Sequence, residues 1–354
     1  MKIGNFDLTK STFIVAELSC NHLGSLDLAK KTICEIAKTG ADAVKLQTEH
    51  PINVTLDYRG DDFIIKGGTL WDGQNLYELC QSTHTPYEWH AELKELTESL
   101  GMVFFSTPGG IGNKDIIDPA DFLEKLNVPC YKISSFELID TPFIRHVAKK
   151  GKPMIMSTGI ANYEDIKLAV ETCKEEGNDQ IILLKCTSAY PTPLEAVNLR
   201  QMQELAKDFN CLVGISDHSL HNEVAIASVA MGGCVIEKHV ILSRKLGGPD
   251  GGFSMEIDEF KEMVDSVRKV EKLLGQGNYK LEDSQKNSRN FMRSLYAAQN
   301  IKAGEVITTE NVRSVRPGFG LHPKYLDKKN PECILGKQAK IDIEHGTRIE
   351  LAMF

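Results

Sequence analysis

The sequence is poor in tryptophan and has no excess of positive charge, and the second shortage excludes a class of protein. Only 2 of the 354 residues are tryptophan, and 49 acidic side chains against 41 basic ones give a formal net charge of −8. A charge of this sign argues against a nucleic-acid-binding protein. An anionic small molecule is still compatible with it, provided that a local cationic pocket lies inside the acidic protein.

The sequence also lacks paired cysteines and long hydrophobic stretches. Its nine cysteines are scattered singly, with no CxxC motif, which is typical of thiols that stay reduced. No stretch approaches the roughly 20 apolar residues that span a membrane. The first residues, MKIGNFDLTKSTFIVAEL, show no small-residue cleavage site of a secretory leader. We therefore expect a cytoplasmic protein without a membrane partner.

Short apolar runs alternate with amphipathic segments through the first 275 residues. Such alternation indicates parallel strands joined by crossover helices, for example over 26–40 and 165–177. Eight repeats in this length predict a (β/α)8 TIM barrel. An open, doubly wound sheet is the alternative, but no GxGxxG motif follows the first run. The runs cover residues 13–18, 43–48, 103–108, 130–135, 153–158, 181–187, 212–218 and 233–240.

All eight runs carry polar residues at their C-terminal ends. The last run, CVIEKHV, is apolar until Glu237, Lys238 and His239. Barrel enzymes place their active sites on the face formed by the C-terminal strand ends. We therefore expect a polar pocket ringed by these residues.

Two histidines end the seventh and eighth runs, which are neighbours in a barrel. Period-two alternation places His218 on the same face as Ser216, and His239 on the same face as Glu237. Paired imidazoles, with the carboxylates of Asp217 and Glu237 nearby, indicate a site for a divalent cation. Two hydrogen-bonded structural histidines are the alternative interpretation.

Three lysines, Lys45, Lys132 and Lys185, also stand near strand ends. Buried lysines are rare unless they are paired, so three converging ones predict an anion between them. Lysines that extend along the barrel rim are one alternative, and a class I aldolase with a Schiff-base lysine is another. Hydroxyl groups suited to phosphate or carboxylate oxygens surround them, from Thr107, Ser134, Ser135, Ser157, Ser188 and Ser216.

The character of the chain changes after residue 275. We expect a barrel domain over 1–276, a hydrophilic linker over 277–290 and a small domain over 291–354. The small domain contains short strand-like pieces and is marginal alone, so we expect it to dock against another surface. Its segment VRPGFGL predicts a rigid, exposed turn at Arg316.

Two further segments are candidate ligand loops. The glycine-rich GGPDGG, 247–252, carries one charge, that of Asp250, and an ordinary turn explains it equally well. The insertion KGGTLWDGQNLYEL, 66–79, holds Trp71 between the second and third strands. Long loops on the catalytic side of a barrel often set specificity, although aromatic residues there can also merely cover the barrel.

These motifs resemble, in order, those of the sialic acid synthases. AELSCNHLG, KLQT, STP, YKISS, STG, KCTSAYPTP, GISDHS, EKHV and GGPD carry the resemblance over the barrel. The tail RSLYAAQNIKAGEVIT…NVRSVRPGFGLHP is similar to the C-terminal antifreeze-like (SAF) domain of that family. The resemblance implies condensation of phosphoenolpyruvate with an N-acetylated aldose to a nine-carbon 2-keto acid, with release of phosphate. It also implies a metal-dependent homodimer in which one subunit's small domain reaches over the other's barrel.

The resemblance implies roles position by position. Ser188 stands where N-acetylneuraminate synthases usually carry asparagine. His218 and His239 match the metal ligands, for Mn2+, Mg2+ or Co2+. Glu17 or Asp250 is the candidate to position or deprotonate water, and Lys132 completes the catalytic set. The phosphoenolpyruvate positions are Lys45, Thr107, Lys132, Ser135, Ser157 and Ser216, and those around the acceptor sugar are Glu17, Gln47, Tyr190, Asp250 and Arg316.

Within the family, the insertion 66–79 followed by TPYEWH is similar to the signature of pseudaminic acid synthases. The acceptor of that branch is 2,4-diacetamido-2,4,6-trideoxy-L-altrose, whose methyl group and second acetamido group require apolar surface. Leu70, Trp71 and Tyr77 are candidates to supply it. The alternatives are an N-acetylneuraminate or legionaminate synthase with another acceptor, and, from a different class, a non-catalytic sugar-binding protein.

Overall fold

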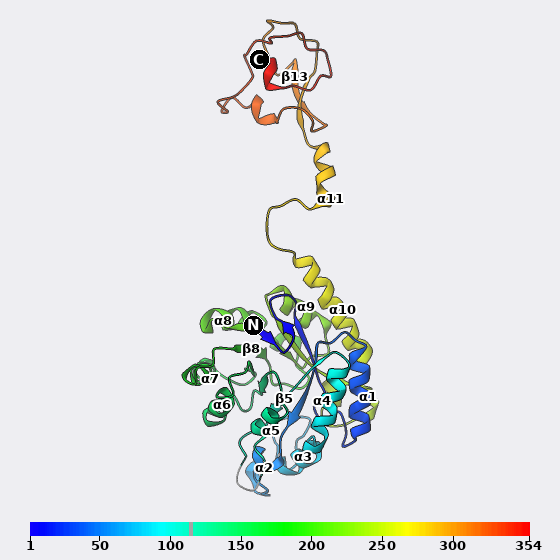
Figure 1. Cartoon of the computed structure of the whole chain (residues 1–354), viewed down its shortest axis with the longest axis vertical. Coiled ribbons are helices and arrows are strands. Elements are labelled where there is room, and N and C mark those ends of the chain that lie inside the picture. Colours follow the sequence, from blue (N-terminus) through cyan, green and yellow to red (C-terminus); the bar gives the residue numbers. More distant parts are fainter. Residues whose placement is uncertain (113–115) are drawn as a thin grey trace. The chain divides into compact units, whose positions relative to one another are not determined.

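The computed structural model describes residues 1–112 and 116–354, and the chain divides into two compact units, Met1–Gly275 and Gln276–Phe354. Each unit has its own hydrophobic core. Figure 1 follows the chain by colour, from the strands and helices of the first unit to the short elements of the second. No described helix has both the length and the apolar character needed to cross a membrane.

The first unit is a closed barrel of eight parallel strands. Hydrogen bonding runs from β3 in order to β9, and β10 pairs with both β9 and β3, which closes the sheet. This closure confirms the predicted TIM barrel and excludes the open sheet. The strands coincide with the predicted runs: β3 (Phe13–Glu17), β4 (Ala43–Thr48), β5 (Val103–Pro108), β6 (Tyr131–Ile133), β7 (Met154–Ser157), β8 (Ile181–Cys186), β9 (Leu212–Asp217) and β10 (Val235–Ile241).

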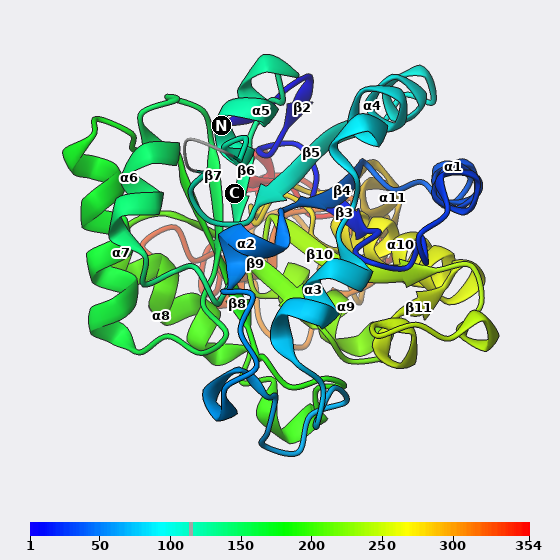
Figure 2. The same ribbon diagram turned by 90° about the horizontal axis from the view of Figure 1, so that it is seen from below.

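Short strands lie outside the barrel wall. β1 (Lys2–Ile3) and β2 (Phe6–Asp7) form an antiparallel hairpin, and β11 (Met255–Glu256) pairs with the end of β10. Helices surround the barrel strands, as Figure 2 shows most clearly for α6, α7 and α8 on one side and for α1 and α10 on the other. The helices of this unit are α1 (Leu26–Ala37), α2 (Pro51–Val54), α3 (Leu76–Thr83), α4 (His90–Ser99), α5 (Pro119–Lys125), α6 (Thr141–Ala148), α7 (Tyr163–Glu175), α8 (Arg200–Phe209), α9 (Asn222–Ala230) and α10 (Ile257–Leu274).

The crossover helices start and pack as their sequences predict. At the start of α7, Asn162 and Asp165 form a capping box that satisfies two backbone N–H groups. α1 begins after Ser25, whose side chain accepts a hydrogen bond from Leu28 N. Burial at helical spacing on these helices, such as Ala29, Ile33 and Ile36 on α1, fixes the apolar face toward the barrel.

The register of the barrel strands brings the polar strand ends into one ring. Glu17 lies opposite Lys45 on β4 and opposite His239 on β10. Glu237 lies opposite Ser216 on β9. Because side chains alternate between the faces of a strand, these matched positions project to one side of the sheet. The fold therefore assembles a site from residues more than 200 positions apart in the sequence.

The second unit is a small β-structure. β12 (Ser294–Ala297) pairs antiparallel with β13 (Val312–Val315), and its core includes Leu295, Val312 and Ile349. Residues 337–343 contribute isolated bridges, Val306 with Gln338 and Ile301 with Ile343. The residues expected to form the linker contain a short α-helix, α11 (Asp283–Lys286), and most of a 3-10 helix, Asn287–Phe291.

Candidate active site

Buried charges of both signs meet at the C-terminal ends of the strands. Lys45 Nζ lies 2.6 Å from Glu17 Oε2 and 3.6 Å from Glu237 Oε1, and it donates a hydrogen bond to Thr107 Oγ1 at 2.9 Å. Lys132 Nζ lies 3.8 Å from the same Glu237 oxygen. All four charged side chains are buried. The barrel thus places two of the predicted lysines around one carboxylate.

Burial changes the proton affinities in this cluster. It raises the pKa of the Glu17 carboxyl, and the charge of Glu237 adds to the rise while Lys45 opposes it. Burial also lowers the pKa of Lys132, although Glu237 counteracts this change. When Glu17 is protonated, two lysines face the single charge of Glu237, so the cluster carries one net positive charge. Such a cluster suits an anionic ligand.

Hydroxyl groups without protein partners lie beside the lysines. The Oγ atoms of Ser157 and Ser188 are buried and have no hydrogen-bond partner among the described residues. Gly159 N donates to Ser135 Oγ at 3.0 Å. A Cβ atom on Gly159 would collide with Ser188 and lie 2.8 Å from Ser135 Oγ and 3.0 Å from Cys186 Sγ. Because buried polar groups are normally paired, this cradle is suited to the oxygens of an anion.

The two predicted histidines lie together on β10 and at the end of β9. Their ring centroids are 5.3 Å apart. His218 Nδ1 lies 3.2 Å from the Thr187 carbonyl oxygen, so a proton on this nitrogen leaves Nε2 with a free lone pair. His239 Nδ1 is buried without a hydrogen-bond partner in the described parts of the chain, and burial lowers the pKa of this imidazole well below its usual value. A neutral imidazole with a free nitrogen is a metal-ligand form, and His239 matches it. Burial lowers the pKa of His218 as well, but Cys186 and the Thr187 carbonyl outweigh that effect and hold this pKa above its usual value.

Asp250 reaches the histidines from the glycine-rich loop. Its Oδ2 lies 3.7 Å from His239 Nδ1 and accepts a hydrogen bond from Ser19 Oγ at 2.5 Å. Burial raises the pKa of this carboxyl. The loop passes close to Leu23 at Gly248, where φ is +96° and a Cβ would clash. The glycine therefore lets the loop approach and bring its carboxylate to the mouth of the barrel.

Aromatic rings line the same side of the mouth. The Tyr190 ring lies 4.5 Å from the His218 ring and 5.0 Å from the Phe253 ring, between centroids. Phe253 also packs edge-on against His239 at 4.9 Å. This packing holds both imidazoles in place.

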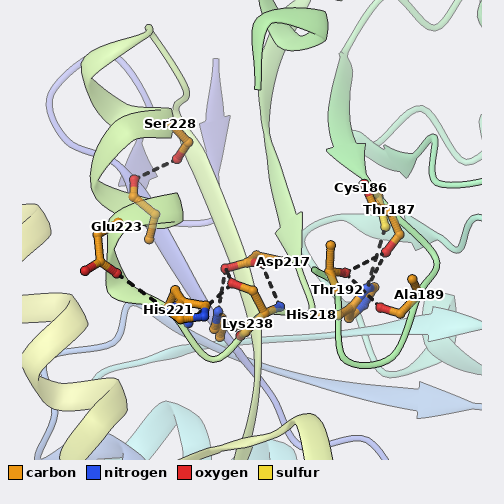
Figure 3. A network of polar contacts seen from close by, with 12 residues as sticks. Cys186, Thr187, Ala189, Thr192, Asp217, His218, His221, Glu223, Ser228 and Lys238 are labelled. Atoms are coloured by element: carbon orange, nitrogen blue, oxygen red, sulfur yellow. Dashed lines mark hydrogen bonds and ion pairs between the residues drawn. The ribbon is translucent and has the colours of Figure 1, made fainter. Parts of the chain in front are cut away.

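Two sequence predictions about this region are wrong. Lys185 does not join the other lysines, because its Nζ donates to the Cys186 carbonyl and to Thr187 Oγ1 at 2.9 Å. Asp217 does not face the histidines either, because its carboxylate forms a buried ion pair with Lys238. Figure 3 shows Asp217 and Lys238 turned toward one another while His218 points toward Cys186 and Thr187. Neighbouring residues on a strand point to opposite faces, so Lys185 and Asp217 point away from the face that carries Ser216 and Glu237.

The other predicted residues occupy three kinds of position. Ser216 Oγ lies 3.5 Å from Glu237 Oε1 inside the cluster, and Gln47 is half-buried on β4 opposite Thr107. Arg316 is exposed and directly follows β13 in the second unit. It therefore belongs to a different compact unit from the residues at the strand ends.

A second group of possible metal ligands lies far along the chain from the histidine pair. Asp118, Asp121 and His146, on α5 and α6, bring their ligand atoms within 4.8 Å of one another. Lys150 already pairs with Asp121, and the backbone N–H groups of Gly112 and Asp121 donate to Asp118. Because these partners already balance the carboxylates, we interpret the group as an ion-pair network on the helix surface rather than as a metal site.

Comparison with known proteins identifies the family. The sequence profile of the NeuB family matches residues 32–279, and that of the SAF domain matches residues 292–354. The chain belongs to the NeuB family. Its second unit contains the SAF domain, and the resemblance seen in the sequence is confirmed.

Relatives within the NeuB family cover the whole chain. The chain is 47% identical to a pseudaminic acid synthase of Campylobacter jejuni over 354 residues, 100% of both proteins. It is 42% identical to a pseudaminic acid synthase of Helicobacter pylori, with 92% of this chain and 93% of the relative aligned. Among solved structures, the spore coat polysaccharide biosynthesis protein SpsE of Bacillus subtilis is 32% identical, with a TM-score of 0.63 over 100% of this chain and 98% of that one.

Three residues of the site have no prediction from the sequence. Ser19 holds Asp250, Gly159 forms the floor of the hydroxyl cradle, and Phe253 packs against both imidazoles. Gly159 had a visible signal, because it directly follows the polar strand end Ser157–Thr158. Ser19 and Phe253 act through contacts across the barrel mouth, which no local pattern encodes.

Proposed function

We propose that this protein is a pseudaminic acid synthase. It condenses phosphoenolpyruvate with 2,4-diacetamido-2,4,6-trideoxy-L-altrose to a nine-carbon 2-keto sugar acid and releases phosphate by C–O cleavage. The observation that carries the proposal is that Lys45 and Lys132 are buried around Glu237 at the same strand ends that carry the unpaired hydroxyls of Ser157 and Ser188 and the histidine pair. The full-length identity to pseudaminic acid synthases supports the choice of acceptor.

Phosphoenolpyruvate would occupy the cationic end of the site. Its carboxylate and phosphate carry up to three negative charges, for which Lys45 and Lys132 supply charge-assisted hydrogen bonds. The free hydroxyls of Ser157 and Ser188 supply donors to phosphate oxygens. Thr107, Ser135 and Ser216 complete the proposed binding set.

The histidine pair would hold the divalent metal on which the family depends. The residues fit such an ion, because His239 Nδ1 is an orphaned buried atom and His218 keeps a free Nε2 when Nδ1 bonds Thr187. Bound there, Mn2+, Mg2+ or Co2+ supplies Lewis-acid polarisation of the acceptor's aldehyde oxygen. Asp250, whose Oδ2 lies 3.7 Å from His239 Nδ1, is a candidate carboxylate ligand beside the pair.

The chain's own residues then account for the remaining steps. The C3 carbon of phosphoenolpyruvate attacks the aldehyde carbon, so that a C–C bond forms from the enol π electrons and positive charge develops at C2. The π electrons of the aldehyde C=O bond pass to its oxygen, which takes up a proton and becomes a hydroxyl group. Water adds at C2 and loses a proton, and the resulting tetrahedral intermediate expels phosphate. Glu17 contacts Lys45 at the phosphoenolpyruvate end, so we assign it to the water. A raised pKa suits a carboxyl that must both take and give a proton near neutral pH.

We further propose a homodimer in which the SAF domain of one subunit covers the barrel mouth of its partner. Large apolar side chains are exposed on loops that follow the barrel strands, for example Phe136, Ile139 and Ile160 at 59%, 65% and 59% exposure. Such a rim is typical of a surface that another protein covers. In the SAF domain, Ser294 Oγ donates to the Pro317 carbonyl at 2.6 Å and so stiffens the turn that presents Arg316. Residues 277–290 would serve as the linker between the domains.

The test is to identify the product. Purified enzyme, phosphoenolpyruvate and the trideoxy altrose should release phosphate and give the nine-carbon acid by mass spectrometry. Faster phosphate release with the N-acetylated hexoses that serve neuraminate or legionaminate synthases would replace the assigned acceptor. A covalent adduct trapped by borohydride would indicate a Schiff-base aldolase instead, and binding without turnover would indicate a sugar-binding protein.

A further inference from the structure

We propose that Trp71 determines acceptor specificity by forming the outer wall of the sugar subsite, where it selects an acceptor whose sixth carbon is a methyl group. The inference rests on the proposed function and deepens it, because it assigns one residue of the 66–79 insertion to one feature of the sugar.

Trp71 ties the insertion to two loops of the barrel mouth. Its indole Nε1 donates to the Pro249 carbonyl at 3.3 Å, directly before Asp250. Its ring packs at 5.4 Å, between centroids, against the ring of Tyr190. One side chain from the loop after β4 thus contacts the loops that follow β8 and β10. A ring that contacts two other loops is held in a better-defined position than a side chain on an unsupported loop.

These contacts place Trp71 at the acceptor end of the site. Tyr190 packs on His218, and Asp250 approaches His239, so both neighbours of Trp71 adjoin the histidine pair. The cationic cluster, in contrast, is built from β4, β6 and β10 around Glu237. A change at Trp71 should therefore affect the sugar and leave phosphoenolpyruvate largely unaffected.

The order in which His218, Tyr190 and Trp71 pack indicates which end of the sugar lies beside Trp71. The aldehyde carbon must lie at the histidine pair, because that is where the C–C bond forms. The sixth carbon is the opposite end of the open chain. Trp71 is separated from His218 by the Tyr190 ring and so occupies the outer end of the aromatic row. An apolar wall at that position accepts a methyl group but leaves a hydroxyl without a hydrogen-bond partner.

The other apolar residues of the insertion differ from Trp71. Tyr77 lies beneath the Arg59 guanidinium, whose Cζ is 5.9 Å from the ring centroid. Leu70 is 52% exposed, although it is the direct neighbour of Trp71. Within the described insertion, Trp71 is thus the apolar residue with recorded contacts to both site loops. Leu70 and Tyr77 provide matched controls.

The experiment compares two acceptors that differ by one oxygen atom, the trideoxy altrose and its 6-hydroxy counterpart. The wild-type enzyme should prefer the 6-deoxy sugar in kcat/KM. Trp71→Ala should reduce that preference about tenfold, mainly through KM for the sugar, because a single apolar group in a pocket contributes discrimination of this order. KM for phosphoenolpyruvate should stay within about twofold. Leu70→Ala and Tyr77→Phe should retain the wild-type preference.

Two further variants keep the proposal open to refutation if Trp71→Ala folds poorly. Trp71→Phe retains an apolar ring and should keep most of the preference, whereas Trp71→Gln offers a hydrogen-bonding group and should favour the 6-hydroxy sugar. An unchanged preference in folded Trp71→Ala or Trp71→Gln overturns the inference and leaves the proposed function standing. Failure of the wild-type enzyme to use either sugar instead overturns the proposed function, and the inference with it.

Discussion

Lysines and carboxylates are buried on both the inner and the outer face of the barrel strands. The two faces differ in whether the buried polar atoms have partners within the protein. On the outer face, Lys238 pairs with Asp217, whose carboxylate also accepts from Ser219 N at 2.9 Å. On the inner face, Glu237 Oε2 and the hydroxyl of Ser157 have no hydrogen-bond partner among the described residues. Burial of a charge therefore does not by itself mark a site. The inner face differs because its unpaired polar atoms accompany buried lysines and carboxylates, and a ligand that paired with these atoms would recover the cost of burying them.

Of the changes proposed here, metal removal should cause the largest loss of synthase activity. We expect a chelator to abolish phosphate release and Mn2+ or a similar ion to restore it, because we propose that the inner-face imidazoles hold an ion that would polarise the aldehyde. His218→Ala and His239→Ala should fold, as thermal unfolding can verify, and lose turnover.

His146→Ala is the matched control for these histidine variants, since it alters the ligand group on α5 and α6. Its activity should be that of the wild type. Full activity of a metal-free preparation would contradict the assignment of a metal to His218 and His239. Loss of activity in His146→Ala alone would indicate that the metal binds the group on α5 and α6 instead.

Removal of the SAF domain should have the next largest effect. Truncation after Asn290 should leave a folded barrel, which has its own core, with almost no synthase activity. Arg316→Ala and Lys132→Ala should each be inactive alone but recover some activity when mixed. One of the two composite sites in a mixed dimer then carries neither substitution.

The control for this mixing experiment is proof that mixed dimers form, obtained by differential tagging and native mass spectrometry. Mixed dimers that remain inactive would show that each site lies within one chain. Arg313→Ala, an exposed arginine on the neighbouring strand β13, should retain activity and separates a specific role of Arg316 from a general effect of charge.

The lysines give a direct comparison of the two faces. Lys45→Ala and Lys132→Ala should each weaken phosphoenolpyruvate binding by about 2–5 kcal/mol, the usual range for loss of one partner of a buried charge pair. Lys185→Ala should leave that affinity nearly unchanged, because its amine bonds the strand end and Thr187 instead. Calorimetric titration of phosphoenolpyruvate into each variant measures all three. Equal losses in all three would remove the distinction between the faces.

A smaller effect should come from filling the hydroxyl cradle. Gly159→Ala places a methyl group among Ser135, Cys186 and Ser188, and overpacking of this kind costs about 1–3 kcal/mol. We expect weaker phosphoenolpyruvate binding with little change in KM for the acceptor. Gly252→Ala is the control, because a Cβ atom there meets open space and the backbone is not in the left-handed region. Gly151→Ala is unsuitable, because φ at Gly151 is +69° and an alanine there would be strained. A similar loss in Gly252→Ala would show that the effect is not specific to the cradle.

The sequence determined much of this protein by itself. Short apolar runs and the strand–helix alternation predicted all eight barrel strands, and the polar residues at their ends predicted where the pocket lies. Local chemistry suffices for these features because secondary structure and burial depend on neighbours in the chain.

Only the tertiary structure decided which polar groups face one another. Asp217 and His218 are adjacent in the sequence, yet one turns to Lys238 and the other to the ring of Tyr190. The side chains of the adjacent residues Lys185 and Cys186 point to opposite faces in the same way. The indole N–H of Trp71 donates to the carbonyl of Pro249, which lies 178 positions away in the sequence. These outcomes depend on strand register, on the face each side chain takes and on loops that close over the barrel. Contacts of this kind join distant segments, so they form only when the barrel has closed.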